Sequence, residues 1–430
     1  MRLCRKRLTL FVIIVLIYLK FSLWLLAYSE AIISPLTVII LTAFQLISRK
    51  KFILNYSYSM MAFVLCSIAG LSCIVNMSFG VLNLYVFIQW IIAILLVSTF
   101  TLEEMSRAYV KAIYIISAFS LVGFSAVVFI PSLVEKFPYI TTTKWIGDSV
   151  SQNIRNMFVC VGVIGVNYKR NWGIFYEPGM FAFQLNMAIF MMLFINRDIR
   201  IKELIVLTIA QLTTTSTNGY ATLVLLYFTY FTQKKSVRTL NGRISPKYDR
   251  MLRNGILTFA IVALIGVCVF FIKNPSRWRF FISKLSEATG NLGSGYERFR
   301  ALKIAMTCII RNPILGVSPD RIRLFSNGAI TTFTPLQWMA NFGVIYGLFC
   351  NMFFCLFGYE KNDRRMNKIF KSLTLFTMIV SQNMTSNCIV LAIILYTSGR
   401  YIQFNRNGRR YVVSNCADLQ HRKIPKKMSL

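Results

Sequence analysis

Apolar stretches about as long as a membrane-spanning helix recur along the chain, with short polar segments between them. A helix needs about 20 apolar residues to cross the hydrocarbon core of a bilayer. The first stretch, 8–27, has no clear small-residue cleavage site, so the sequence predicts a retained helix rather than a signal peptide. Further spans are predicted at 31–48, 52–74, 78–100, 108–130, 179–195, 254–272 and 334–357. The pattern therefore predicts an all-α, polytopic integral membrane protein.

Two longer apolar stretches are interrupted by polar runs. The stretch 203–231 is broken at 213–219, and the stretch 369–398 is broken at 381–387. Segments rich in Lys and Arg lie on both sides of each stretch, and such segments stay in the cytoplasm. Each stretch is therefore predicted to be a hairpin of two short helices that meets outside. The total becomes about 12 transmembrane helices with both termini in the cytoplasm.

The composition agrees with one polytopic domain over 1–430. Of its residues 56% are hydrophobic and 15% are charged, whereas soluble domains have about 25% charged residues. A net charge of +33 by itself suggests nucleic acid, but the basic residues flank apolar spans, so no nucleic-acid partner is predicted. The single histidine, His421, lies in the basic cytoplasmic tail 400–430. A histidine metal site within the membrane is excluded, and no metal or cofactor is predicted.

Two outer loops, 131–178 and 273–332, are too long for plain connections between helices. Basic residues on the outer face oppose the usual charge bias, which leaves two interpretations of the second loop. Arginine binds phosphate in a bidentate manner, so the loop can hold an anionic ligand. Alternatively, it is attracted to anionic lipid headgroups. Its basic residues are Lys273, Arg277, Arg279, Lys284, Arg298, Arg300, Lys303, Arg311, Arg321 and Arg323.

Within this loop, 296–310 has the periodicity of a helix that stops at Asn312-Pro313. One face is polar and comprises Arg300, Lys303, Thr307 and Arg311. Arg298 projects with the opposite, apolar face, which comprises Leu302, Ala305 and Ile309. A charge there is costly unless it is paired or meets a ligand. Either Arg298 binds an anion, or it lies in a frayed first turn.

The first loop ends in the run 169–179, where Glu177-Pro178 precedes a span. Proline suits the first position of a helix and an acid suits its N-terminus, so this can be a plain helix start. Alternatively, Glu177 is a carboxylate at the membrane surface that pairs with Arg170 or acts as a general base. The apolar run 157–166 is too short to cross the membrane and is predicted to be re-entrant or to lie at the surface.

These segments resemble the O-antigen polymerase (Wzy) family, within the superfamily of bacterial O-antigen polymerases and ligases. The likeness covers roughly 165–350. Residues 170–179 read Arg-Asn-Trp-Gly-Ile-Phe-Tyr-Glu-Pro-Gly, 216–219 form a Ser/Thr-Gly break, and 312–317 read Asn-Pro-Ile-Leu-Gly-Val after the arginine pair. An apolar helix with an early glycine follows at 342–347. Ligases of the superfamily usually carry a histidine just before that helix, where this chain has Thr332-Phe333-Thr334. This departure favours a polymerase and leaves the general base unassigned.

The resemblance implies a GT-C-like glycosyltransferase in the bacterial inner membrane that polymerises undecaprenyl-diphosphate-linked oligosaccharide units at its periplasmic face. The product would be O-antigen of lipopolysaccharide or a similar surface polysaccharide, with a chain-length regulator as a further partner. The predicted catalytic residues are Arg170, Glu177 and Arg298, and the predicted substrate-binding residues are Arg300, Arg311 and Asn218. Two alternatives remain, a flippase or transporter of lipid-linked oligosaccharide and an O-antigen ligase.

Overall fold

The computed structural model of the chain describes most of the predicted helices. The described residues are 2–21, 30–49, 54–136, 139–142, 152–156, 161–163, 170–175, 177–196, 199–232, 238–239, 242–243, 294–325, 333–360, 363–380 and 382–400. The predicted span at 254–272 and almost all of the tail 400–430 lie outside these residues. For Arg298 and Arg323 the structure describes the backbone only.

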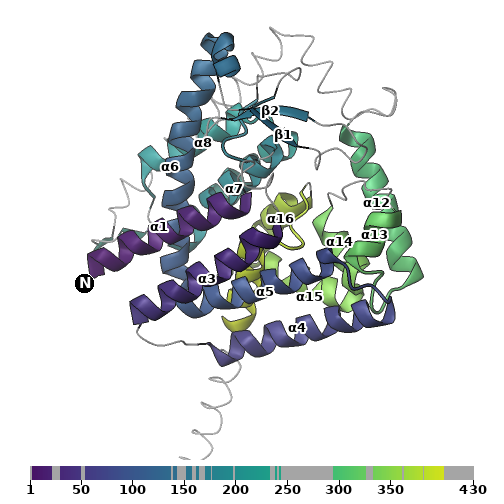
Figure 1. Cartoon of the computed structure of the whole chain (residues 1–430). Helices are drawn as coiled ribbons and strands as arrows, with labels where there is room; N and C mark the ends of the chain where they lie inside the picture. Colours follow the sequence, from purple (N-terminus) through teal and green to yellow (C-terminus); the bar gives the residue numbers. More distant parts are fainter. Residues whose placement is uncertain are drawn as a thin grey trace, which may run out of the picture.

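The chain folds into a bundle of helices (Figure 1). The N-terminal helices are α1 (Arg2–Phe21), α3 (Glu30–Arg49), α4 (Tyr56–Val75), α5 (Val81–Thr99) and α6 (Leu102–Phe129). The middle helices are α7 (Pro178–Phe190), its π-helical continuation η2 (Met191–Asn196), α8 (Ile201–Thr213) and α9 (Thr217–Thr232). The last are α12 (Ser294–Arg311), α13 (Pro319–Phe325), α14 (Thr334–Phe342), α15 (Val344–Cys355), α16 (Arg365–Val380) and a final helix, Cys388–Arg400.

Four helices in the described part of the chain are long and apolar enough to cross a bilayer. They are Tyr56–Val75, Val81–Thr99, Leu102–Phe129 and Pro178–Asn196. Shorter apolar helices accompany them at Arg7–Leu19, Ile33–Ile47, Val344–Cys355 and Cys388–Arg400. These helices confirm a helical, membrane-embedded protein, while the count of about 12 crossings stays a prediction.

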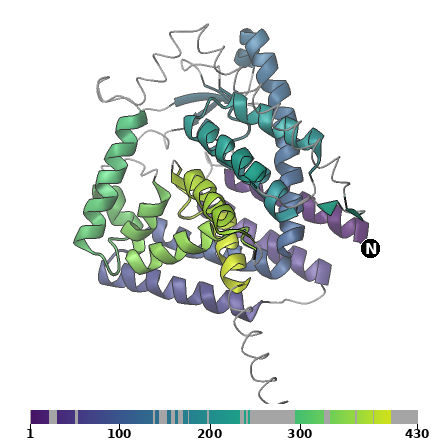
Figure 2. The ribbon, with the colours of Figure 1, turned by 180° about the vertical axis from the view of Figure 1, so that it is seen from behind.

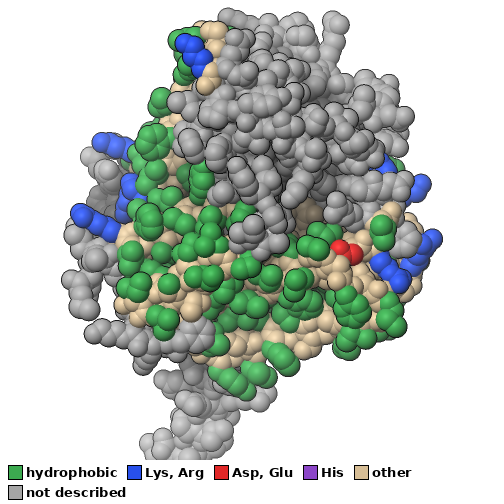
Figure 3. Space-filling view, viewed as in Figure 1, with side chains coloured by type: hydrophobic (Ala, Val, Ile, Leu, Met, Phe, Trp, Pro, Cys, Tyr) green, Lys and Arg blue, Asp and Glu red, His purple; other side chains and the backbone are tan. Residues whose placement is uncertain are grey.

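The face of the bundle formed by α3, α4 and α5 is largely apolar. Figure 3 shows hydrophobic side chains spread over the face formed by α3, α4 and α5, with Lys and Arg side chains near its edges. On α4 the exposed apolar side chains include Phe63, Leu71 and Val75. A soluble protein rarely exposes so large an apolar patch, so this surface suits contact with lipid chains.

Small strands occur between the helices. A 3₁₀ turn (η1, Pro131–Lys136) follows α6, and then β1 (Tyr139–Thr142), β2 (Gln152–Asn156) and β3 (Val161–Val163) form an antiparallel sheet. β3 lies within the predicted surface segment 157–166. A second pair, β4 (Arg238–Thr239) and β5 (Gly242–Arg243), follows α9.

α7 is the central helix of the bundle. Nearly all its side chains are buried, and it packs against α6, α8, α9 and α16. Two views of the ribbon, Figures 1 and 2, show α16 beside the α7–α9 group, with α12 at the far edge of the molecule. Aromatic contacts stiffen this core: Phe190 of α7 packs on Phe194 of η2 and on Phe357, with ring centroids 4.8 Å and 5.8 Å apart. The C-terminal end of α7 is therefore held in a fixed position.

Both predicted breaks are present. α8 ends at Thr213, and Thr215 adopts a positive φ of 49° before α9 begins at Thr217. The Thr214 hydroxyl donates to the Gln211 carbonyl, a local bond that competes with continuation of the helix. α16 ends at Val380, and the last helix begins at Cys388. Because both stretches consist of short helices, the prediction of interrupted helices is confirmed.

The predicted single span 334–357 is wrong. Gly343, with a φ of +92°, separates α14 from α15. A Cβ atom on Gly343 would lie 1.8 Å from the Ile314 carbonyl oxygen, because the turn that follows α12 packs into the break. The Val344 amide donates to the Pro313 carbonyl at 2.8 Å, and the Val317 amide donates to the Ala340 carbonyl at 2.8 Å. A hydropathy profile cannot predict this break, because the break depends on contacts with the turn that follows α12.

Candidate functional site

The start of α7 matches the helix-start interpretation of the Glu-Pro motif. Glu177 is the N-cap with extended backbone (φ −152°), and Pro178 stands at the first helical position. The Phe181 amide donates to the Glu177 carbonyl at 3.2 Å. The half-buried Glu177 side chain makes no capping hydrogen bond. It is therefore not used to close the helix end, and its role as a base stays a prediction.

Arg170 binds the break between α8 and α9. Its Nε donates to the Thr214 carbonyl at 3.2 Å and to Thr215 Oγ1 at 2.8 Å, and Nη2 donates to the Thr215 carbonyl at 3.2 Å. A cation at the C-terminus of a helix is favourable because it meets the unpaired carbonyls of the last turn. These contacts hold the polar break in place, and the predicted pairing of Arg170 with Glu177 or with a phosphate stays a prediction.

Asn171 also binds the end of α8, next to the break between α8 and α9. This role was not predicted from the sequence. The side chain is buried; its Nδ2 donates to Thr213 Oγ1 at 3.0 Å, and its Oδ1 accepts from Ser120 Oγ at 2.6 Å. The Asn171 backbone amide donates to the Thr213 carbonyl at 2.9 Å. After the left-handed Gly173 (φ +58°), the ring of Phe175 stacks on Phe181 of α7. The segment 170–175 thus joins the start of α7 to the first break.

The second break, which follows α16, lies beside the start of α7 and the first break. Asn218, in the first turn of α9, donates from Nδ2 to the Thr377 carbonyl of α16 at 2.8 Å. A Cβ atom on Gly179 would lie 2.2 Å from Nε2 of Gln382, which sits in the break after α16. Gly179 therefore allows α7 and this break to approach closely. The start of α7 and the two breaks converge, although they are far apart in the sequence.

A shallow recess lies at this convergence, and it is too tightly packed to hold a water molecule. It is lined by Gly179, Ala182, Phe183, Asn186, Ser216, Asn218, Gly219, Thr222 and Met378. All these side chains are uncharged. Of the predicted site residues, Asn218 lines the recess and Glu177 stands two residues before Gly179.

The arginines of the second loop lie on a different element. α12 packs against α14 and α13, with Ala301, Ala305 and Cys308 buried. Arg311 is exposed at its C-terminal end, and Arg300 is half-buried. The predicted helix 296–310 and its stop at Asn312 are confirmed. The structure does not describe the side chain of Arg298, so its predicted ligand contact is neither confirmed nor excluded.

The turn after α12 is anchored to the N-terminal half of the bundle. The Asp320 carboxylate accepts hydrogen bonds from the Leu82 amide at 3.3 Å and the Asn83 amide at 3.4 Å, at the N-terminus of α5. An acid is favourable there because it meets unpaired amides at the positive end of the helix dipole. Nδ2 of Asn76 adds a 3.0 Å bond to the Gly316 carbonyl. These contacts set the position of α12 and its arginines.

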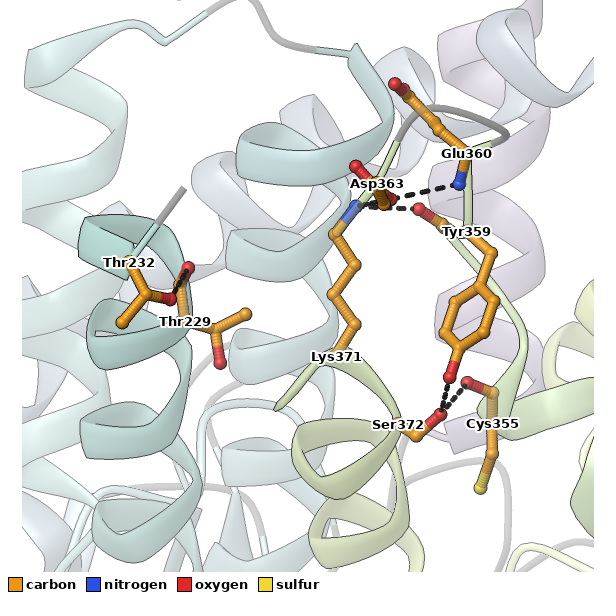
Figure 4. A network of polar contacts seen from close by, with 9 residues as sticks. Thr229, Thr232, Cys355, Tyr359, Glu360, Asp363, Lys371 and Ser372 are labelled. Carbon is orange, nitrogen blue, oxygen red and sulfur yellow. Dashed lines mark hydrogen bonds and ion pairs between the residues drawn. The ribbon is translucent and has the colours of Figure 1, made fainter. Parts of the chain in front are cut away.

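A buried ion pair lies between α15 and α16 (Figure 4). Lys371 Nζ lies 2.8 Å from Asp363 Oδ2 and also donates to the Gly358 carbonyl at 2.9 Å. The two side chains are 1% and 2% exposed. The backbone amide of Glu360 donates to the same carboxylate at 3.0 Å. The pair clamps the connection between the two helices. It could not be predicted from the sequence, where Lys371 is one of many basic residues in segments predicted to be cytoplasmic.

Comparison of the chain with protein-family models, with curated proteins and with solved structures gave no match. Among the described residues, no group of three or more His, Cys, Asp or Glu side chains is placed to hold a metal ion.

Proposed function

We propose that this protein is a polytopic glycosyltransferase of the bacterial inner membrane, with both termini cytoplasmic. It polymerises undecaprenyl-diphosphate-linked oligosaccharide units at the periplasmic face, into O-antigen or a similar surface polysaccharide. Its partners are the lipid-linked oligosaccharide, the bilayer and a chain-length regulator. The proposal begins from the resemblance of 165–350 to the O-antigen polymerase family.

The observation that carries the proposal is the contact of Arg170 with the break at Thr214 and Thr215. Arg170 belongs to the family resemblance, and Thr214 and Thr215 directly precede the Ser/Thr-Gly break 216–219 that also belongs to it, although 44 residues separate Arg170 from Thr214 in the chain. Two sequence motifs that resemble the family only by chance need not lie next to each other in the fold. Their contact next to Glu177-Pro178 supports a single polar site at the membrane surface.

The chemistry needs a base and cations. A sugar hydroxyl of the acceptor attacks the anomeric carbon of the donor, and the bond from that carbon to the diphosphate oxygen breaks. The hydroxyl proton passes to a base, for which Glu177 is the candidate. The lipid diphosphate leaves with both bonding electrons, and arginine groups stabilise its developing charge. We assign this contact to Arg298, with Arg300 and Arg311 in support.

In this scheme Arg170 has mainly a structural role and is not simply a residue that binds the diphosphate. Its Nε and Nη2 already donate to the break. It therefore positions the first break next to Glu177, and any contact with the diphosphate is additional to that role.

The test of the activity is complementation. The gene is deleted in its source strain, and the surface polysaccharide is examined on a gel, where a polymerase yields a ladder of lengths. We expect single-unit products in the deletion strain and a restored ladder with the wild-type gene. An unchanged ladder after deletion would contradict the proposal. Genes for sugar-nucleotide enzymes and a separate flippase beside this gene would support it.

Sidedness is tested separately with reporter fusions. We expect fusions at residues 150 and 300 to report the periplasm and fusions at 240 and 365 to report the cytoplasm. A cytoplasmic signal at 300 would remove the proposed site, because the flipped substrate would be on the other side of the membrane.

A transporter of lipid-linked oligosaccharide is the second candidate, because such a protein would also have about 12 membrane-spanning helices. The two functions differ in the deletion strain. Loss of a polymerase leaves single units on the cell surface, whereas loss of a flippase traps the lipid-linked units inside. The missing histidine at 332–334 disfavours the third candidate, a ligase.

A further inference from the structure

The outward face of α12 is apolar. Phe299, Met306 and Ile310 are 58%, 41% and 74% exposed. Their spacing of seven and four residues places them in one stripe along the helix. The opposite side of α12, where Ala305 and Cys308 are buried, packs against the bundle at α14. The exposed stripe therefore does not hold α12 in the fold.

The apolar surface continues beyond the end of α12. Ile314, in the turn that follows the helix, and Leu324 of α13 are both exposed. A single apolar side chain on a surface needs no explanation, but several along one element mark a surface that meets a membrane or another protein. The position of α12 in the fold distinguishes between these two.

The turn after α12 is attached to the connection between two helices of membrane-spanning length, α4 and α5. Nδ2 of Asn76, in that connection, donates to the Gly316 carbonyl at 3.0 Å, and the Ser318 hydroxyl donates to Ser78 Oγ at 2.8 Å. Figures 1 and 2 show α12 crosswise to α4 and α5 at this end of the pair. Because the connection between two spans lies at a membrane surface, α12 is placed at that surface as well.

The connection between α4 and α5 is itself apolar on its outer side. Val75, Met77, Phe79 and Val81 are all exposed. In water these side chains would be hydrated at a cost, whereas in contact with lipid chains they are removed from water. The apolar surface of α4 and α5 thus extends up to the segment that holds α12, which favours lipid over a partner protein as the cover of the stripe.

Basic side chains flank the stripe. Lys303 and Arg311 are exposed, Arg300 is half-buried, and Arg321 of α13 is exposed. Figure 3 shows Lys and Arg side chains gathered at the edge of the molecule where α12 and α13 lie, beside apolar side chains. Long basic side chains keep their stems in an apolar layer while the charge reaches water or phosphate. An apolar stripe flanked by Lys and Arg is the pattern of a helix that lies in a membrane interface.

We propose that α12 lies in the lipid–water interface at this end of α4 and α5. Phe299, Met306 and Ile310 enter the acyl layer of the phospholipid leaflet, and Lys303 and Arg311 lie at the level of its phosphates. This inference goes beyond the proposed function and does not depend on it. For a polymerase it has a consequence: the arginines of α12 are held at the depth of the diphosphate of a lipid-anchored substrate, which reaches them by diffusion within the membrane.

The test measures the depth of two neighbouring positions of α12 in a bilayer. Ile310→Cys, in the stripe, and its matched control Thr307→Cys, on the polar side, are made in a background without other reactive thiols and labelled with a nitrobenzoxadiazole fluorophore. Both native side chains are exposed, so neither change disturbs the packing. In lipid nanodiscs, nitroxide-bearing phospholipid should quench the label at 310 about threefold more strongly than the label at 307. Iodide in the water should show the reverse preference.

A second measurement leaves the native cysteines in place. The photocrosslinking residue benzoylphenylalanine replaces Ile310 or Leu324 in cells, with the exposed Leu71 of α4 as the reference for a lipid-facing position. After irradiation, the purified full-length protein is analysed by mass spectrometry. We expect covalently bound phospholipid at 310 and 324, as at 71.

The outcomes decide between lipid, water and protein as the surroundings of the stripe. Equal quenching of the two labels by both quenchers would overturn the proposed orientation of α12. Cross-linking of residues 310 and 324 to another protein, seen as a larger band on a gel, would also overturn it. The polymer ladder is a separate readout: its absence contradicts the polymerase, while lipid contact at 310 supports the interfacial helix by itself.

Discussion

Asn218 and Thr377 join the two interrupted hairpins: the side-chain amide of Asn218 donates a 2.8 Å hydrogen bond to the Thr377 carbonyl. Asn218 follows the first break by two residues, and Thr377 lies in the last turn of α16, just before the second break. A hydroxyl contact at 3.4 Å between Thr222 and Thr377 reinforces the link. The two breaks are thereby placed side by side, and the candidate site is built on this link.

We expect both breaks to be accessible to water from outside. Asn218 and Asn383 are each half-buried within polar breaks, and backbone groups freed at a helix break need polar partners. Asn218→Cys and Asn383→Cys, in a background without other reactive thiols, should react with an impermeant maleimide. Labelling of residue 300 under the same conditions is the positive control. Complete protection at both positions would contradict an outward-facing site.

Arg298→Lys should abolish most polymerisation while the protein still accumulates in the membrane. Lysine keeps the charge but loses the planar fork that binds phosphate in a bidentate manner. Loss of one preorganised contact to developing charge costs about 3–4 kcal/mol, or roughly 10²–10³ in rate. The measurement is the polymer ladder. Arg323→Lys and Lys284→Arg are the controls and should be near neutral; a normal ladder from Arg298→Lys would make α12 a general basic surface.

Arg170→Lys should affect stability as well as activity. The wild-type side chain makes three hydrogen bonds to Thr214 and Thr215, and a single ammonium group cannot reproduce the geometry of the guanidinium fork. Because hydrogen bonds from charged groups contribute about 1.5–3 kcal/mol each, the thermal midpoint in detergent should fall measurably. An unchanged midpoint combined with lost activity would instead make Arg170 a direct ligand of the diphosphate.

Gly343→Ala should destabilise the protein strongly. Its φ of +92° is strained for any side chain, and the added Cβ would lie 1.8 Å from the Ile314 carbonyl oxygen. Gly70, in the middle of α4, is the matched control because a Cβ there meets nothing within 4 Å. Gly70→Ala should be neutral or stabilising by up to about 1 kcal/mol. Equal thermal midpoints for the two variants would contradict the observed break between α14 and α15.

Asp363→Asn should destabilise the bundle by about 3–5 kcal/mol, because it leaves the buried Lys371 ammonium without its carboxylate. The double variant Asp363→Asn, Lys371→Met removes both charges and should recover much of that loss. Thermal unfolding of the three proteins gives the comparison. If the pair only clamps the helices, the double variant keeps the polymer ladder. A stable double variant that makes no polymer would instead show that the pair has a direct role in activity.

Local rules of the sequence determined much of the architecture. The helices Tyr56–Val75, Val81–Thr99, Leu102–Phe129 and Pro178–Asn196 lie where hydropathy predicts spans. α7 begins at the Glu-Pro pair, and α12 stops at Asn312-Pro313. The breaks at 213–219 and 381–387 were also predictable. Each of these features depends on the properties of residues near each other in the chain: apolar length, the missing amide of proline, and hydroxyl groups that bond to their own backbone.

Only the tertiary structure decided which of these pieces meet. Arg170 bonds to Thr215 across 45 residues of chain, Gly343 breaks an apolar stretch, and Lys371 finds a buried partner in Asp363. Whether a polar or charged atom is satisfied depends on segments distant in the chain, and that is settled only when the helices pack.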